Sequence, residues 1–98
     1  MKILLVCAGG MSTSILMRKM EKYWAEQKVP LTIEAVGIAD YEETCPEYDM
    51  ILVGPQVGYR LEEIKEHSGK PCSVIPSTDY ALGNCDRIMA LANSLLKQ

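Results

Sequence analysis

Short apolar segments along the chain alternate with longer segments in which apolar residues recur every three or four positions. The short segments predict four β-strands, over residues 2–6, 31–37, 50–53 and 72–75. The first and third strands are nearly unbroken apolar runs, which is typical of strands buried on both faces. The second alternates apolar with polar residues and the fourth follows Pro71, and both features are typical of strands at the edge of a sheet.

Helical spacing predicts three longer helices between and after these strands. The first covers about residues 12–28 and ends before Pro30, which cannot continue a helix. The second follows the third strand from residues 54–56 onward, and the third follows Asn84, its expected N-cap. Residues 76–84 are expected to form a loop. The apolar residues that should face the sheet are Leu16, Met20, either Tyr23 or Trp24, Val57, Leu61, Ile64, Ile88, Leu91, Ala92 and Leu95.

Alternating strands and helices predict an α/β fold with a single open four-stranded parallel sheet and helices on both faces. Placing the apolar strands in the centre gives the strand order 2-1-3-4. Such sheets bind ligands at the carboxyl ends of their strands, where the order reverses, which here lies between the first and third strands. Cys7 follows the first strand, Gln56 follows the third, and Asp79 and Tyr80 follow the fourth. We therefore expect Gln56, Asp79 and Tyr80 to flank Cys7.

Length and composition narrow the function classes. The 98 residues are expected to form one domain, 1–98, because a chain of this length supports a single core. The net charge is −3 and there is no basic run, which excludes nucleic acid as an expected partner. No apolar run is long enough for direct membrane insertion. The start of the chain lacks the features of a signal peptide, so a cytoplasmic location is expected.

Four cysteines and one histidine offer few metal ligands. No two cysteines form a Cys-x-x-Cys unit, so we expect no metal and no other cofactor. Cys72 and Cys85 are expected to be packing residues, and Cys45, before Pro46, to be exposed. His67 falls in the last turn of the second long helix, where a capping or surface role is expected.

The first strand leads directly into Cys7 and a loop of small and hydroxyl residues, after which the first helix begins. This loop comprises Cys7, Ala8, Gly9, Gly10, Met11, Ser12, Thr13 and Ser14. Small side chains allow successive backbone N–H groups to turn toward one point, where the helix N-terminus adds partial positive charge. The pattern predicts a phosphate-binding loop whose donors would also stabilise a thiolate at Cys7.

Four interpretations of Cys7 remain open on these residues. It could be an inert cysteine at the end of a core strand. It could be the nucleophile of a hydrolase like the low-molecular-weight tyrosine phosphatases, but their Cys-x5-Arg pattern is not met, because Thr13 is the sixth residue after Cys7. It could lie beside a non-catalytic anion-binding site. It could carry a phosphoryl group, for which a loop without a charged clamp is suitable, since such a clamp supports hydrolysis.

Three motifs together resemble a known family. They are residues 6–14, Gly54-Pro55-Gln56-Val57 with Tyr59, and Asp79-Tyr80 with Gly83-Asn84. They are similar to the IIB component of the bacterial phosphoenolpyruvate-dependent sugar phosphotransferase system, lactose/cellobiose (chitobiose, lichenan) family. The similarity covers nearly the whole chain. The sequence departs from the family pattern at residues 76–78. The expected fold is that of these IIB proteins and of low-molecular-weight tyrosine phosphatases.

The resemblance implies a cytoplasmic phosphoryl carrier. Cys7 would take a phosphoryl group from a phosphohistidine of a IIA protein, and the amides of residues 8–14 would hold it. The group would then pass to a sugar of cellobiose, chitobiose or lactose type held by a IIC membrane transporter. Two partners must reach Cys7 in turn, so we expect exposed apolar contacts at Met11, Tyr59 and Tyr80, and a monomer when the protein is free. Asp79 is expected to be an ordinary turn residue, with a direct role as the alternative.

Overall fold

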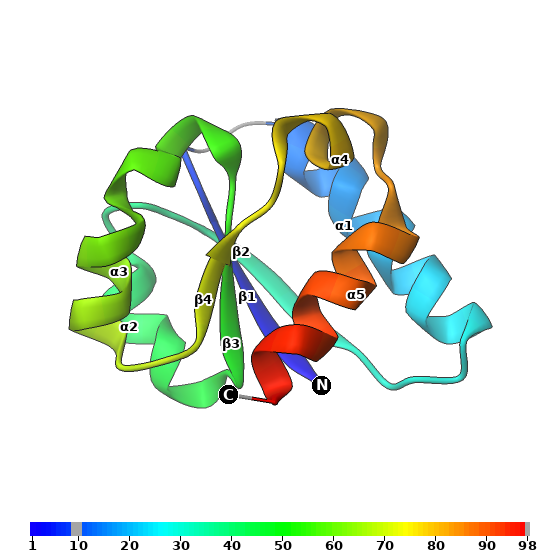
Figure 1. Cartoon of the computed structure of the whole chain (residues 1–98), viewed down its shortest axis with the longest axis horizontal. Coiled ribbons are helices and arrows are strands. Elements are labelled where there is room, and N and C mark those ends of the chain that lie inside the picture. Colours follow the sequence, from blue (N-terminus) through cyan, green and yellow to red (C-terminus); the bar gives the residue numbers. More distant parts are fainter. Residues whose placement is uncertain (9–10, 98) are drawn as a thin grey trace.

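Four parallel strands form one open sheet in the order β2-β1-β3-β4, as predicted (Figure 1). They are β1 (Lys2–Cys7), β2 (Thr32–Gly37), β3 (Met50–Val53) and β4 (Cys72–Val74). The computed structural model describes residues 1–8 and 11–97, with the backbone alone at 11 and 12. The apolar strands β1 and β3 occupy the centre, where every residue from 3 to 6 and from 50 to 53 is buried.

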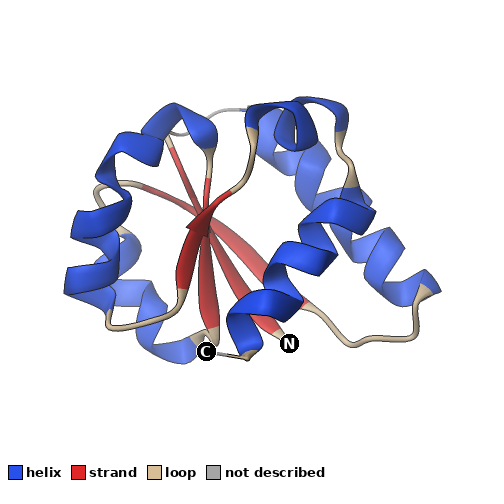
Figure 2. Cartoon of the chain, viewed as in Figure 1, coloured by secondary structure: helices blue, strands red, loops and turns tan. Residues whose placement is uncertain are grey.

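Helices cover both faces of the sheet, which confirms the predicted fold class (Figure 2). One face packs against α1 (Met11–Glu26), α4 (Ser77–Leu82) and α5 (Cys85–Leu96). The other packs against α2 (Tyr41–Thr44), the 3₁₀ turns η1 (Cys45–Glu47) and η2 (Pro55–Arg60), and α3 (Leu61–Ser68). The two groups of helices lie on opposite sides of the strands in Figure 1.

The side-chain alternation of β1 divides the core into two parts. Ile3 and Leu5 belong to the cluster under α1 and α5, whereas Leu4 and Val6 belong to the cluster under α3. Successive residues of a strand point to opposite faces, so an apolar residue at every position is needed where both faces are covered. The unbroken apolar run in the sequence therefore has a direct structural cause.

The register of the sheet leaves the end of β1 open on one side. β1 pairs with β2 as far as Cys7 and Gly37, but its pairing with β3 ends at Val6 and Val53. The backbone N–H of Gly54 then donates to the Val6 carbonyl at 2.8 Å as the chain turns away into η2. Cys7 thus extends beyond the central pair of strands at the carboxyl edge of the sheet.

The expectation that residues 76–84 form a loop is wrong, because residues 77–82 form the short helix α4. Pro76 precedes this helix, and its carbonyl accepts the first helical hydrogen bond from Tyr80 N–H at 2.9 Å. Asp79 in the first turn is favourable beside the positive end of a helix. Gly83 ends the helix in the left-handed conformation, with φ of 66°.

Cys45 is buried, which contradicts the prediction that it is exposed. The segment that contains it folds as η1 and packs on the α3 side of the sheet together with Tyr41 and Tyr48. Pro46 only marked a turn in the sequence, whereas the burial comes from tertiary packing. Within the described part of the chain, no helix combines the length and apolar character needed to cross a membrane.

Candidate functional site

Cys7 is the last residue of β1 and lies at the predicted switch point, between β1 and β3. Its side chain is buried, with 4% of its surface exposed, and its thiol approaches the Val36 carbonyl with an Sγ–O distance of 3.7 Å. The thiol therefore lies toward the β2 side of this edge.

The loop itself is described in part. Ala8 and Ser14 are exposed and Thr13 is buried. The predicted phosphate-binding residues outside the described set are Gly9 and Gly10, together with the side chains of Met11 and Ser12. The backbone of α1 begins at Met11, and its first turn contains no acidic residue. The start of α1 is therefore free of the carboxylates that would repel an anion there.

Gly54 brings the end of β3 against Cys7. A β-carbon on Gly54 would lie 3.6 Å from the Cys7 Cβ and 3.1 Å from the Gln56 Oε1. The side chain of Gln56 therefore folds back over this glycine, at the same edge of the sheet as Cys7. Gln56 and Cys7 are thus both near neighbours of Gly54. Pro55, Gln56, Ser77, Tyr80 and Ala81 line an open hollow there.

Thr13 and Tyr80 form a buried hydroxyl pair, with an Oγ1–Oη distance of 3.0 Å. Thr13 belongs to the first turn of α1 and Tyr80 to α4, so this hydrogen bond joins two elements that are 67 residues apart in sequence. Tyr80 is buried, and the expectation that it is an exposed partner contact is wrong. Tyr59, by contrast, is 83% exposed, as predicted.

Asp79 is directed toward α5. Its carboxylate Oδ1 accepts hydrogen bonds from Asn84 Nδ2 at 3.0 Å and from Arg87 Nε at 2.9 Å. The hydrogen bond from Asn84 contributes most to holding the pKa of Asp79 below its ordinary value, and Arg87 adds to the effect. Asn84 stands at the N-cap of α5, as predicted, but its side chain bonds Asp79 and does not cap the helix.

Sequence reasoning missed the contacts of Thr13 with Tyr80 and of Asp79 with Arg87. Both depend on α4, which was expected to be a loop. Thr13 and Tyr80 are 67 residues apart in the sequence. Asp79 and Arg87 belong to two different helices, α4 and α5. Periodicity along the chain contains no signal for either contact, because it reports only which face of an element is apolar.

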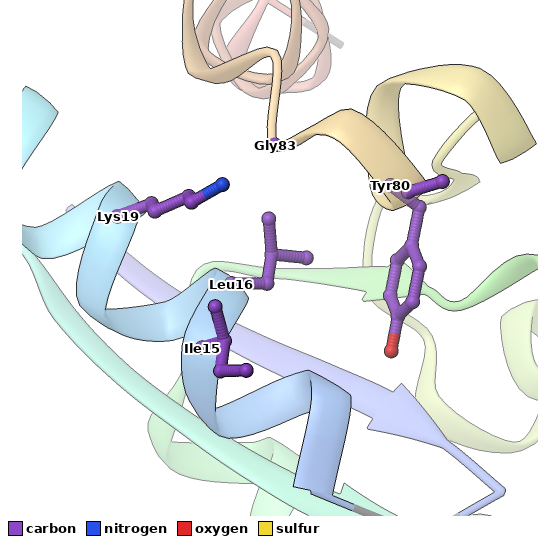
Figure 3. A pocket seen from close by; sticks show the side chains of 6 residues that line it. Ile15, Leu16, Lys19, Tyr80 and Gly83 are labelled. Atoms are coloured by element: carbon purple, nitrogen blue, oxygen red, sulfur yellow. The ribbon is translucent and has the colours of Figure 1, made fainter.

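A small hollow of about 150 Å³ lies between α1 and α4, with Tyr80 in its wall (Figure 3). It is lined by Ile15, Leu16, Lys19, Tyr80, Ala81 and Gly83. Ile15 and the neighbouring Leu82 are large apolar side chains with 59% and 65% of their surfaces exposed. Apolar surface that is accessible to a partner therefore lies on the α1 and α4 side of the Cys7 edge.

Cys72, Cys85 and His67 belong to β4, α5 and α3. Cys72 and Cys85 are buried, as predicted, and burial is the main reason that the pKa of each thiol is raised. His67, in the last turn of α3, approaches Glu42 with an Nδ1–Oε1 distance of 3.0 Å. Among residues 1–8 and 11–97, no group of three or more His, Cys, Asp or Glu residues is placed to hold a metal ion.

The fold and site together define a class: an open parallel α/β sheet with a cysteine at its switch point, followed by a small-residue loop and a helix. A family model described as "PTS system, Lactose/Cellobiose specific IIB subunit" matches residues 2–90. The chain therefore belongs to the lactose/cellobiose-specific IIB subunits of the sugar phosphotransferase system. This confirms the resemblance that its motifs indicated.

Known relatives agree with this assignment. The galactose-specific EIIB component of Lactococcus lactis subsp. cremoris is 37% identical, over 96% of this chain and 94% of that protein. The solution structure of a cellobiose-specific IIB component from Borrelia burgdorferi covers 99% of this chain and 92% of its own, with 37% identity and a TM-score of 0.82. A longer chain, the lactose-specific EIICB component of Lactococcus lactis, is 32% identical over 69% of this chain but only 12% of its own length.

Proposed function

We propose that this IIB subunit carries a phosphoryl group on Cys7, between a phosphohistidine of a IIA protein and a sugar held by a IIC membrane transporter. The observation that carries the proposal is the position of Cys7, at the end of the central strand β1 and directly before the loop that enters α1. Membership of the lactose/cellobiose-specific family supports the phosphotransferase role.

The first step is an in-line transfer to the thiolate of Cys7. The sulfur attacks the phosphorus, an S–P bond forms, and the P–N bond to the donor histidine breaks with its electron pair passing to nitrogen. Backbone N–H groups of residues 8–14 and the hydroxyls of Ser12, Thr13 and Ser14 would bind the equatorial oxygens. The donor is a protein phosphohistidine, so the step requires no nucleotide or metal ion.

The second step returns the electron pair to sulfur. A hydroxyl of the sugar attacks the phosphorus, an O–P bond forms and the S–P bond breaks. The hydroxyl proton needs a base, and Asp79 is poorly suited because its carboxylate is already bonded to Asn84 and Arg87. A carboxylate would also repel the phosphoryl dianion. We assign the base to the transporter.

Under this proposal, hydrolysis of the phosphocysteine is the reaction that competes with transfer to the sugar. Tyrosine-phosphatase loops place an arginine six residues after the cysteine, where it grips the phosphate with two hydrogen bonds. Thr13 occupies that position here, and its hydroxyl contacts Tyr80. Arg60 and Arg87 form ion pairs with Glu63 and Asp79. A neutral loop that stabilises phosphocysteine without assisting attack by water suits a carrier.

The partners follow from the same chemistry. The lactose-specific EIICB relative is named for both IIC and IIB, which supports a IIC transporter as the acceptor side. Transfer would then take place at the cytoplasmic face of the membrane, with the chain remaining outside the bilayer. The relatives are named for galactose, cellobiose and lactose, so we propose a sugar of this type, selected by the transporter.

Intact-mass measurement tests the proposal. The protein is incubated with phosphoenolpyruvate, the general phosphotransfer proteins and a cognate IIA, beside the variants Cys7→Ser and Cys85→Ser. We expect one added phosphoryl group in the wild type and in Cys85→Ser, and none in Cys7→Ser. Absence of the adduct while IIA is phosphorylated would refute the carrier role. An aryl-phosphate assay on the same samples tests the alternative hydrolase function. Only a phosphatase-like hydrolase would turn over an aryl phosphate in a reaction that depends on Cys7.

A further inference from the structure

The Thr13–Tyr80 pair lies where α1 leaves the Cys7 loop. Thr13 is the third residue of α1, and Tyr80 lines two hollows, one shared with Pro55 and Gln56 and the other with Ile15 and Lys19. Gln56 in turn folds over Gly54, which packs against Cys7. Tyr80 therefore occupies the same edge of the sheet as the cysteine, although it lies 73 positions further along the chain.

We propose that Tyr80 is a positioning residue for the phosphoryl site, and that it acts through Thr13. Its phenol donates a hydrogen bond to Thr13 Oγ1, which leaves the hydroxyl hydrogen of Thr13 available for a phosphoryl oxygen on Cys7. This inference rests on the proposed carrier function and extends it to a residue outside the loop.

The direction of the hydrogen bond follows from the chemistry of the two hydroxyls. Each has one hydrogen and two lone pairs, so within the pair only one can donate to the other. A phenol is more acidic than an aliphatic alcohol and is therefore the better donor. Hydrogen bonds in a chain polarise one another, so a donating Tyr80 makes the hydroxyl of Thr13 a stronger donor toward an anion.

The surrounding structure fixes Tyr80 in place. Its ring belongs to the core cluster that includes Leu16 and Met20 of α1. Figure 3 shows the ring extending from α4, with the hydroxyl directed away from that helix. The hydrogen bonds of Asp79 to Asn84 and Arg87 join α4 to α5. A hydroxyl on a ring held in this way loses little freedom when it bonds Thr13, which is what a positioning residue requires.

The test measures the equilibrium constant for phosphoryl transfer from phospho-IIA, together with the ³¹P chemical shift of the phosphocysteine. Thr13→Val removes the proposed donor, and we expect the equilibrium constant to fall about tenfold, because hydrogen bonds to charged groups are strong. Tyr80→Phe removes only the polarising hydroxyl, and we expect a fall of about twofold, because polarisation along a chain strengthens a hydrogen bond by roughly 10–30%. Thr13→Ser keeps the hydroxyl and should stay near the wild type.

The double variant Thr13→Val/Tyr80→Phe is decisive. If Tyr80 acts through Thr13, the double variant should match Thr13→Val alone, and the ³¹P shift should move in Tyr80→Phe. Tyr48→Phe is the matched control, because it also removes the hydroxyl of a buried tyrosine, one that bonds Glu34 and not Thr13, and this loss should change neither readout.

A purely structural role for Tyr80 would give a different result. Tyr80→Phe would then lower the melting temperature while the equilibrium constant and the ³¹P shift remained those of the wild type, and the inference would be overturned. Additive effects in the double variant would overturn it as well. If wild-type Cys7 took no phosphoryl group, the carrier function itself would fail, and this inference would fail with it.

Discussion

The side chain of Lys19 lies directly across Gly83. A β-carbon on Gly83 would stand 2.7 Å from the Lys19 Cδ, which is closer than real β-carbons approach other atoms, and 3.0 Å from its Nζ. Gly83 also has a φ of 66°, and its position at the end of α4 requires that conformation. The backbone therefore favours glycine at this position, and a larger residue would also have to displace the flexible end of the Lys19 side chain.

Gly83→Ala should consequently destabilise the protein more than Gly69→Ala. Both glycines have a φ of 66°, but nothing lies within 4 Å of a β-carbon on Gly69. We expect Gly69→Ala to lower the free energy of unfolding by about 1 kcal/mol, from backbone strain alone. For Gly83→Ala we expect about 1.5 kcal/mol, because the flexible end of the Lys19 side chain must also move. Urea denaturation measures both values.

The variant Lys19→Ala provides the control for the steric part. In the Lys19→Ala background, Gly83→Ala should lower the free energy of unfolding by no more than Gly69→Ala lowers it in the wild type. Equal costs for the two glycines in the wild type would show that the Lys19 side chain moves freely, and would contradict the predicted difference.

Asp79 should contribute stability that disappears in acid. Its hydrogen bonds with Asn84 and Arg87 lower its pKa in the folded state below the ordinary value of 3.8. A group with a depressed folded-state pKa stabilises the protein above its unfolded pKa, and loses this contribution as the pH falls toward the folded pKa. The stability difference between the wild type and Asp79→Asn should therefore be constant above about pH 5 and should shrink below pH 3.8.

Thermal unfolding of the wild type and Asp79→Asn between pH 7 and about pH 2.5 checks this window. Asp86→Asn is the matched control, because Asp86 is an exposed aspartate in the first turn of α5. A difference between wild type and Asp79→Asn that stayed the same down to the lowest pH would count against the role assigned to the Asn84 and Arg87 contacts.

Trp24 should be the most costly side chain to remove from the α1 side of the core. It is fully buried in the cluster with Met20, and its indole N–H is directed at the Met1 Sδ, 3.3 Å away. We expect Trp24→Ala to lower the free energy of unfolding by about 3–5 kcal/mol, because the cavity cannot fully close. Leu96→Ala, at a half-exposed site, should change it by less than about 0.5 kcal/mol. Urea titration compares the two, and similar losses would contradict the packing.

Ile15 and Leu82 should contribute to recognition of the phosphodonor. Both are exposed apolar residues: Ile15 lines the hollow between α1 and α4, and Leu82 stands in the sequence between the lining residues Ala81 and Gly83. Under the carrier function, Ile15→Ser and Leu82→Ser should each raise the KM for phospho-IIA by about fivefold, with kcat little changed. A fivefold change corresponds to about 1 kcal/mol of binding free energy, which is what the lost burial of apolar surface should cost. Leu96→Ser, near the end of α5, is the control. A change confined to kcat would exclude a docking role for these residues.

Local patterns predicted most of the architecture. Central strands are covered on both faces, so the runs at residues 3–6 and 50–53 had to be apolar at every position. The edge strands β2 and β4 showed their positions by alternation and by Pro71. The strand order and the place of Cys7 follow from these features together with the parallel connections. All of this information is local in the sequence, so it could be obtained without the tertiary structure.

Tertiary structure alone decided how the site is supported. α4 is a six-residue helix, too short for a periodic signal, so its burial of Tyr80 and its contact with Thr13 had no trace in the sequence pattern. The same is true of the bond between Asp79 and Arg87 and of the burial of Cys45. The physical reason is that a pattern determines which face of an element is apolar, whereas the partner of a polar side chain depends on how separate elements pack in three dimensions.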